Sequence, residues 1–307
     1  MAAKIDLKTY VKEVRKNMNL TDVRDEIISK DLLLTLILAE FQKEDGVFNE
    51  LIFKGGTLLS RNYLKYHRFS EDLDFVHKNS GEFRELKRRA REKKIKGFIE
   101  LFVPKLKKVA DTLDLEFNET RSDMKYCSIL HGRTVYTFRI YYETNRYIKI
   151  EINFVEKLIN SPKETLIKAI TDFFDSKELM FILGLNIENF KVLSYPIEEI
   201  ILEKYRAVLT RKEFKERDLF DLFLIKDSLK ININEVVDKI KNSSLIKREL
   251  DTLIKEKLSL LEKNEFFNSD EKLEELAILD YDKQELENFK EKIQPILVEI
   301  CKEFLKK

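Results

Sequence analysis

Apolar and polar residues follow two different periods along the chain, and the change from one to the other predicts where helices and strands lie. Residues 22–43 place apolar side chains every three or four positions, as in a helix that buries one face, and Asp45-Gly46 is expected to end it. Shorter patterns predict, in order, a strand at 51–54, a helix at 55–66, a strand at 72–76 and a helix at 83–110. The first third of the chain is therefore expected to mix helices with strands.

Three runs after residue 110 alternate apolar and polar residues one by one, as a strand does when one face of its sheet is buried. They are residues 113–117, 136–142 and 148–154. Near Pro162 the pattern becomes helical and is expected to remain so. The helices expected there are 197–211 after Pro196, about 217–228, shorter ones within 234–262, and 282–306. We therefore predict an α+β part over residues 1–160, with N-terminal helices, and an all-α part over residues 161–307.

Composition and charge indicate the kind of protein but do not indicate a binding partner. The 57 basic and 56 acidic residues nearly cancel, so any attraction to nucleic acid must come from a local patch rather than from the net charge. Two cysteines far apart in the sequence have no metal-ligand spacing and indicate a reduced chain. The opening residues lack the apolar run of a signal peptide, and no stretch is long enough to span a bilayer. We expect a cytoplasmic protein that does not contact a membrane.

Asp72 and Asp74 are the residues with the clearest chemical meaning. In a strand, residues two apart point to the same face, so these carboxylates are expected to stand side by side. Two carboxylates this close repel each other unless a cation lies between them or one takes up a proton. Mg²⁺ prefers one or two carboxylates, with water and substrate phosphate in its other positions. The pair therefore predicts a magnesium site, whereas the bland alternative is a solvated strand end.

Gly55-Gly56-Thr57, directly after the first expected strand, can expose backbone N–H groups to a phosphate at a helix N-terminus. The alternative is a plain tight turn, which would expose the same groups. Residues 58–71 separate this turn from Asp72 and predict a long helix or one with a kinked exit. The chain has no Gly-x4-Gly-Lys-Ser/Thr segment, which argues against a P-loop NTPase, and its three histidines lack ligand or triad spacing.

These residues resemble a known family. Gly55-Gly-Thr57 followed by Arg68-x-Ser70-x-Asp72-x-Asp74 is similar to the first motif of the AbiEii/AbiGii-type toxin nucleotidyltransferases, a branch of the DNA polymerase β-like superfamily. Residues 147–154 resemble the strand with that superfamily's third carboxylate, and residues 203–222 its helical Lys…Arg-Asp-x-x-Asp segment. The resemblance covers roughly residues 20–230. It implies a nucleotidyltransferase-fold mixed sheet with flanking helices, followed by an all-α C-terminal domain that contributes to the active site.

The resemblance also implies roles for particular residues. Asp72, Asp74 and Glu151 would hold two Mg²⁺ ions, and Lys204 and Asp218 would join them in catalysis. Contacts to the NTP phosphates would come from nine residues: Lys54, Gly55, Gly56, Thr57, Arg68, Ser70, Lys204, Arg211 and Asp221. From the residues alone, alternation favours a solvent-facing strand charge at Glu151, and Lys204 has the alternative of an ordinary surface lysine. Asp218 also fits the preference of a first helical turn for acidic side chains.

The activity implied is transfer of a nucleoside monophosphate from an NTP to an RNA acceptor, with a tRNA 3′ end as the expected target. Such an enzyme would block translation as a toxin and would be countered by an antitoxin, expected to be a winged-helix regulator. Residues 84–108, with 11 Lys/Arg against 3 Glu, are a candidate RNA footprint, although charge runs are mostly solvated faces. Two other readings stay open: the same fold acting on a protein hydroxyl or small molecule, and a nucleotide-binding module without catalysis.

Overall fold

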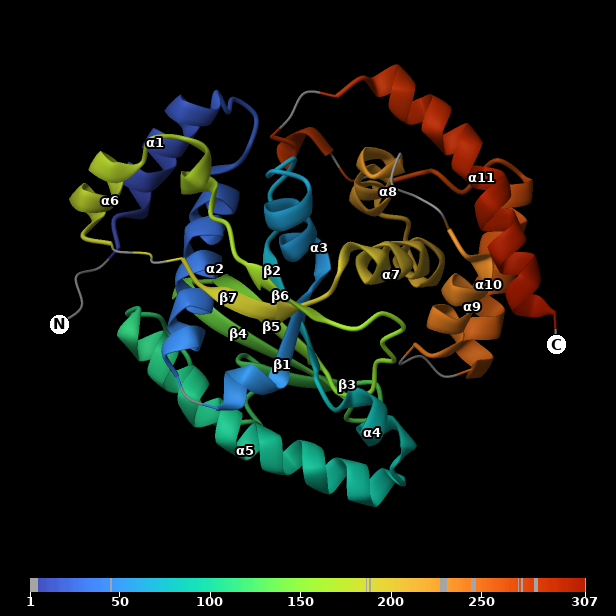
Figure 1. Ribbon diagram of the computed structural model, residues 1–307, viewed down its shortest axis with the longest axis horizontal. Coiled ribbons are helices and arrows are strands. Elements are labelled where there is room, and N and C mark those ends of the chain that lie inside the picture. Colours follow the sequence, from blue (N-terminus) through green and yellow to red (C-terminus); the bar gives the residue numbers. More distant parts are fainter. Residues whose placement is uncertain are drawn as a thin grey trace. The chain divides into compact units, whose positions relative to one another are not determined.

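The chain forms two compact units in the computed structural model, which describes residues 5–44, 46–185, 187, 189–226, 231–243, 247–269, 271, 273–278 and 281–306 (Figure 1). The first unit comprises Met1–Glu156, Pro162–Tyr195 and Glu274–Ile278. The second comprises Lys157–Ser161, Pro196–Leu273 and Leu279–Lys307. Residues 162–195, which we expected in the helical part, thus lie in the first unit.

A seven-stranded mixed sheet forms the centre of the first unit, in the order β3-β4-β5-β2-β1-β7-β6 (Figure 1). The strands are β1 (Leu51–Lys54), β2 (Asp72–His77), β3 (Cys127–Leu130), β4 (Val135–Glu143), β5 (Arg146–Asn153), β6 (Lys163–Leu166) and β7 (Lys191–Ser194). β2 runs antiparallel to β1 and parallel to β5, while β1 runs parallel to β7. The predicted α+β class with a mixed sheet is therefore confirmed.

Alternation along the strands gives the sheet one apolar face and one partly polar face. On β5, Ile148, Ile150 and Ile152 are buried, whereas Lys149 and Glu151 remain half-buried. The long helix α5 (Arg88–Thr112) packs aromatic side chains on the apolar face, with the rings of Phe102 and Phe138 5.2 Å apart and those of Phe98 and Phe154 5.5 Å apart. The opposite face of β2 and β5 is thus left for the charged side chains.

Further helices complete the first unit. They are α1 (Leu7–Met18), α2 (Asp25–Lys43), α3 (Gly55–Leu58), α4 (Ser80–Glu85) and α6 (Lys177–Leu183). A buried ion pair joins α2 to the π-helical turn Leu59–Tyr63 that follows α3, because the Arg61 guanidinium lies 2.7 Å from the Asp31 carboxylate and both side chains are almost fully excluded from solvent. Apolar residues of α1 and α2, including Tyr10 and Ile27, form a core with Phe69, just ahead of β2.

Three predicted elements in this unit differ from the observed ones. Residues 113–117 are not a strand: α5 runs on to Thr112, and only Glu116 makes a bridge, to Tyr141, so the alternation reflects a loop packed on the core. The helix expected at 55–66 is α3 followed by a π-helical turn, and Lys65 and Tyr66 have positive φ, which gives the kinked exit. The helix expected at 83–110 breaks at residues 86–87 into α4 and α5.

The helical pattern expected from Pro162 onward is also wrong for two short segments, because β6 and β7 are strands that extend the sheet at one edge. Each has four residues. β6 has no buried position, and β7 buries Val192 and Ser194, but its sequence Lys-Val-Leu-Ser does not alternate apolar and polar residues. β6 and β7 are strands because neighbouring strands pair with them, and not because of their own composition. The same holds for β3 at the other edge of the sheet.

The second unit is helical. Its helices are α7 (Ile197–Thr210), α8 (Glu216–Leu224), α9 (Ile233–Lys241), α10 (Lys247–Glu262) and α11 (Lys283–Leu305). The predicted helices at 197–211 and 282–306 are confirmed, and Pro196 is the N-cap of α7. Asp45 and Ser228, where two helices were expected to end, lie outside the described residues. Among the described residues, no helix is long and apolar enough to cross a membrane.

A short segment near the C-terminus returns to the first unit. Residues 274–278 pair with the stretch that leads into β2, since the Phe69 N–H donates to the Leu276 carbonyl at 2.9 Å and the Ile278 N–H donates to the His67 carbonyl at 2.9 Å. Arg68 and Ala277 form the bridge between them. The segment before Asp72 is thus held by residues far later in the sequence.

Candidate active site

Three neighbouring strands bring the predicted carboxylates together. The register places Lys54 of β1 opposite Asp74 of β2, and Asp74 opposite Glu151 of β5. Asp72, two residues earlier on β2, lies opposite Lys149. Because registered residues share a face of the sheet, Asp72, Asp74 and Glu151 form one group, which we call the carboxylate cluster. The sequence predicted its three members, and the strand register shows that they adjoin.

Glycines 55 and 56 form the turn that lies against this cluster. Gly55 has φ +84°, and a Cβ placed on it would lie 3.1 Å from both Cβ and Cγ of Asp74 and closer still to a carboxylate oxygen. A Cβ on Gly56 would lie 2.8 Å from the Arg68 guanidinium and 3.2 Å from the Ser70 hydroxyl. The absence of side chains is therefore what allows Asp74, Arg68 and Ser70 to approach the backbone of the predicted phosphate cradle.

Replacing Gly55 by Ala is expected to lower the nucleotide-transfer rate by about tenfold to a hundredfold, because a methyl group would push the Asp74 carboxylate out of place. Gly46→Ala is a matched control, since Gly46 has φ +86° but nothing within 4 Å of an added Cβ. Both variants place a side chain at a positive φ, so both melting temperatures should fall, and that of Gly55→Ala should fall further because of the contact with Asp74. Equal rates in the two variants would show that contact with Asp74 does not matter.

Lys149 is the residue in this group that the sequence analysis did not assign. Its ammonium lies 2.8 Å from Asp72 Oδ2, with the two side chains 30% and 35% exposed. Burial opposes its charge, but the carboxylates of Asp74 and Asp72 outweigh this effect and raise the pKa of Lys149. Strand alternation alone places Lys149 on the face of Glu151, two residues later, but its pairing with Asp72 depends on the β2–β5 register.

Burial and neighbouring negative charges disfavour the ionised forms of two of these carboxylates. Burial raises the pKa of Glu151, and the negative charge of Asp74 adds to that rise. Burial also raises the pKa of Asp72, although Lys149 works in the opposite direction. Two acids with raised pKa values beside a third indicate a cluster built for a cation or proton rather than for stability.

Lys54 is engaged in a buried ion pair. Its ammonium contacts the Glu156 carboxylate, which also accepts a 2.8 Å hydrogen bond from the Tyr195 hydroxyl. The Lys54 ammonium lies 5.7 Å from the centre of the Tyr195 ring. Glu156 and Tyr195 were not predicted, and no spacing in the sequence could link them to Lys54. Lys54 lies opposite Asp74 in the register of β1 and β2, but its ion pair is with Glu156, which is not part of the carboxylate cluster.

The remaining predicted residues of the first unit hold the turn and the strand in position. The Thr57 hydroxyl donates to the Asp72 carbonyl at 2.5 Å, which ties the start of α3 to the start of β2. Arg68 is 3% exposed and donates to the Phe69 carbonyl at 2.7 Å, while its own carbonyl accepts from Ser60. Arg68 and Ser70 both lie next to Gly56. The hydroxyl of Thr57 and the guanidinium of Arg68 thus have structural partners.

The other predicted residues gather in the second unit. Lys204 of α7 lies 2.8 Å from Asp218 and 2.6 Å from Asp221 of α8, and Arg211 lies 2.8 Å from the other oxygen of Asp218. We call these four residues the Lys204 cluster. Burial pushes the pKa of Asp218 upward, but Lys204 and Arg211 outweigh burial and leave the pKa below its ordinary value. Arg211, 45% exposed, is the one member that faces solvent.

The cluster of the first unit fits a hard cation in its chemistry. Its ligands are oxygens only, and Asp72 is 35% exposed, so water and a substrate phosphate have room to complete the coordination that Mg²⁺ requires. Within the described residues, no group of three or more His, Cys, Asp or Glu side chains could hold a metal ion by itself. Asp72, Asp74 and Glu151 would therefore hold an ion only together with oxygen atoms from substrate and water.

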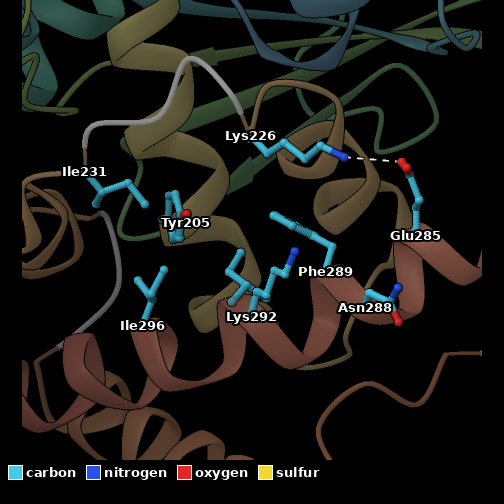
Figure 2. Close-up of a pocket in the computed structure, with 9 residues that line it drawn as sticks. Tyr205, Lys226, Ile231, Glu285, Asn288, Phe289, Lys292 and Ile296 are labelled. Atoms are coloured by element: carbon cyan, nitrogen blue, oxygen red, sulfur yellow. Dashed lines mark hydrogen bonds and ion pairs between the residues drawn. The ribbon is translucent and has the colours of Figure 1, made fainter.

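The second unit also contains a cavity (Figure 2). It measures about 450 Å³, and among its lining residues are Tyr205 of α7 and Phe289 of α11. Lys226 and Glu285 form an ion pair of 3.4 Å at its wall. Burial raises the pKa of Tyr205, which keeps its hydroxyl protonated. None of the predicted site residues lines this cavity, so it gives no support for their roles.

The comparison with protein families agrees with the sequence motifs. The profile of the family described as nucleotidyl transferase AbiEii toxin, type IV toxin–antitoxin system, matches residues 37–299. Among solved structures, MenT4, a nucleotidyltransferase toxin from Mycobacterium tuberculosis, is 15% identical, with a TM-score of 0.46 over 96% of this chain and 98% of that one. JHP933 from Helicobacter pylori is 17% identical, with a TM-score of 0.38 over 92% and 97% of the two chains. No curated protein sequence matches significantly.

Proposed function

The chain belongs to the AbiEii family of nucleotidyltransferase toxins of type IV toxin–antitoxin systems, and on that premise we propose that it transfers a nucleoside monophosphate from an NTP to an RNA hydroxyl, with Mg²⁺ as cofactor. The observation that carries the proposal is the row of charges on three adjoining strands, Lys54, Asp74 and Glu151, with the Gly55-Gly56 turn against it. A phosphate cradle beside grouped carboxylates is what attack at a phosphorus atom requires.

In this reaction the acceptor hydroxyl oxygen attacks the α-phosphorus, the bond to the bridging oxygen breaks, and pyrophosphate leaves. Glu151, which lies opposite Asp74 in the β2–β5 register, is suited to orient that hydroxyl, whose proton passes to solvent. Asp72 and Asp74 would hold Mg²⁺, which when bound neutralises charge on the phosphates; a second ion would arrive with the NTP. The backbone of Gly55–Thr57, with Lys54, Arg68 and Ser70 around it, would hold the phosphates.

The Lys204 cluster is the second group of residues to which we assign a role in the reaction. Arg211 is partly exposed and can reach an anion, while the Lys204 ammonium is buried and held in place by Asp218 and Asp221. We assign Lys204 and Arg211 to the NTP phosphates, with Asp218 and Asp221 as the groups that position them. Exchange of Arg211 for Gln should then raise the KM for the NTP.

The acceptor in this proposal is RNA, and a tRNA 3′ end is the expected one. The test is to incubate the protein with each α-labelled NTP, Mg²⁺ and total cellular RNA, alongside an Asp74→Asn control. A labelled RNA band that the control lacks would support transfer and reveal both the nucleotide and the acceptor. Label on protein alone would favour a protein hydroxyl as acceptor. Bound NTP without any label would favour a nucleotide-binding module.

The basic run offers a footprint for RNA, although a smaller one than its composition indicated. Five of its cations are paired with acids: Arg88, Lys94, Lys96, Lys107 and Lys108. Lys87, Arg89 and Lys93, at the start of α5, form no ion pair within the described part of the chain. Cations at a helix N-terminus also interact unfavourably with the positive end of the helix dipole. RNA phosphates would supply the missing negative partners and offset this unfavourable interaction.

Exchange of Lys87, Arg89 and Lys93 for Gln is expected to reduce RNA labelling by about tenfold at moderate salt and to flatten its salt dependence, with NTP binding unchanged. The matched control exchanges Lys96, Lys107 and Lys108, which lie on the same helix but have acidic partners. It removes the same charge and should leave labelling within about twofold of the wild type. If both triple variants lose labelling equally, net charge and not this patch guides the RNA.

Membership of the family implies an antitoxin partner. We propose that it is a winged-helix regulator encoded beside the toxin and that, without it, transfer to tRNA stops translation. Expression of the chain alone should arrest growth, and co-expression of the adjacent regulator should restore it. The cytoplasmic location stays a prediction.

A further inference from the structure

Lys149 occupies the position where a cation would be expected. It lies opposite Asp72 in the parallel register of β2 and β5, and its ammonium is 2.8 Å from Asp72 Oδ2. Glu151 follows two residues later on the same face, opposite Asp74. The ammonium therefore stands on the same face of the sheet as all three acids of the carboxylate cluster.

The charge of this group fits one divalent ion. The carboxylates of Asp72, Asp74 and Glu151 and the ammonium of Lys149 leave a formal charge of minus two, from three negative groups and one positive. Lys54 does not change this count, because Glu156 neutralises it. One Mg²⁺ would balance the group, whereas a second ion would need the additional negative charge that a triphosphate brings.

We propose that Lys149 is a positioning residue that serves as the built-in counter-ion of the carboxylate cluster: it holds Asp72 while the site is empty, gives way when the metal enters, and so weakens metal binding. The inference rests on the proposed function in one respect, that Asp72 and Asp74 hold the ion. A merely structural cross-strand pair would stabilise the sheet without altering affinity for a cation.

The test measures Mn²⁺ binding without nucleotide, by calorimetry and by the Mn²⁺ spin-resonance signal. Lys149→Met is expected to tighten Mn²⁺ binding by about tenfold or more, since a positive charge within a few ångströms of the ion is removed. Lys149→Arg should bind Mn²⁺ as the wild type does. Lys107→Met, which removes an equal charge from a paired lysine on α5, should have no effect.

Asp74→Asn distinguishes failure of the metal site from failure of the counter-ion role of Lys149. If it leaves Mn²⁺ affinity unchanged, the metal site itself is wrong and the Mg²⁺ part of the proposed function fails with it. If it abolishes binding while Lys149→Met binds no more tightly than the wild type, the metal site stands and the role of Lys149 is refuted.

A second measurement needs no variant and covers the case in which Lys149→Met does not fold. Acylation of the wild-type protein by a succinimidyl ester, followed by mass spectrometry, reports how free each lysine amine is. Reaction at Lys149 should accelerate when Mn²⁺ is added, because Asp72 then binds the ion instead, while reaction at Lys107 stays constant. An unchanged rate at Lys149 would contradict the proposal.

Discussion

Asp74→Asn is expected to lower nucleotide transfer by about a thousandfold or more without harming the fold. Asp74 stands at the centre of the charged row, between Lys54 and Glu151, and its carboxylate lies against Gly55. Loss of a metal-binding carboxylate forfeits several kcal/mol of charge stabilisation in the transition state, and about 1.4 kcal/mol is a factor of ten in rate. The rate is measured with α-labelled NTP and RNA.

The same variant should be at least as stable as the wild type near neutral pH. Burial and then Asp74 raise the pKa of Glu151, so ionising this group costs folded-state stability as pH rises from its unfolded pKa through its folded one. An amide at position 74 removes that repulsion, and its advantage in unfolding free energy should grow over this pH range. Asp111→Asn, which alters only an exposed pair with Lys107, is the control. A large loss of stability in Asp74→Asn would mean that Asp74 is structural.

Lys204→Met is expected to destabilise the protein by about 3–5 kcal/mol, because it leaves two carboxylates buried without their shared cation. Asp218 and Asp221 are 2% and 0% exposed, and both lie within 2.8 Å of the Lys204 ammonium. Equilibrium unfolding in urea at neutral pH, followed by circular dichroism, measures the change. Lys157→Met is the matched control, since its 2.8 Å pair with Asp238 is nearly half exposed and should contribute about 0–1 kcal/mol.

The pH dependence gives this prediction a second check. The pKa of Asp218 is lowered in the folded protein, so the stability that this carboxylate contributes is present above about pH 4, the ordinary range of an aspartate, and is lost as pH falls through its folded pKa. In Lys204→Met the buried acids take up protons more readily. The difference in unfolding free energy between wild type and variant should therefore shrink towards low pH, and a constant difference would contradict the buried-charge explanation.

The sequence predicted those elements whose own residues show which face is buried. Strand β5 was found because Ile148, Ile150 and Ile152 bury one face, and α7 because its apolar face has helical spacing. The Asp72 and Asp74 pair could be predicted for the same reason, since strand alternation sets two residues side by side. Family resemblance then supplied Glu151, which alternation alone could not separate from a solvated charge.

What the sequence could not predict depends on contacts between distant segments. Strands β3, β6 and β7 are four residues long and exist because a neighbouring strand pairs with them. The Lys54 partner, Glu156, is 102 residues away, and the counter-ion of Asp72 follows only from the β2–β5 register. A one-residue shift of that register would turn Lys149 and Glu151 to the apolar face, so side-chain roles here depend on strand pairing.

The pairing of residues 274–278 with the segment before β2 has a consequence for synthesis of the toxin. Phe69 and His67 receive their backbone partners only when Leu276 and Ile278 have left the ribosome. At about 5–20 residues per second, residues 196–273 delay that moment by on the order of 10 s after the rest of the first unit has been made. A nascent chain that stops before residue 274 thus lacks the segment that pairs with Arg68, so the stretch that leads into β2 obtains its last backbone partners only after the helices α7 to α10 have been made.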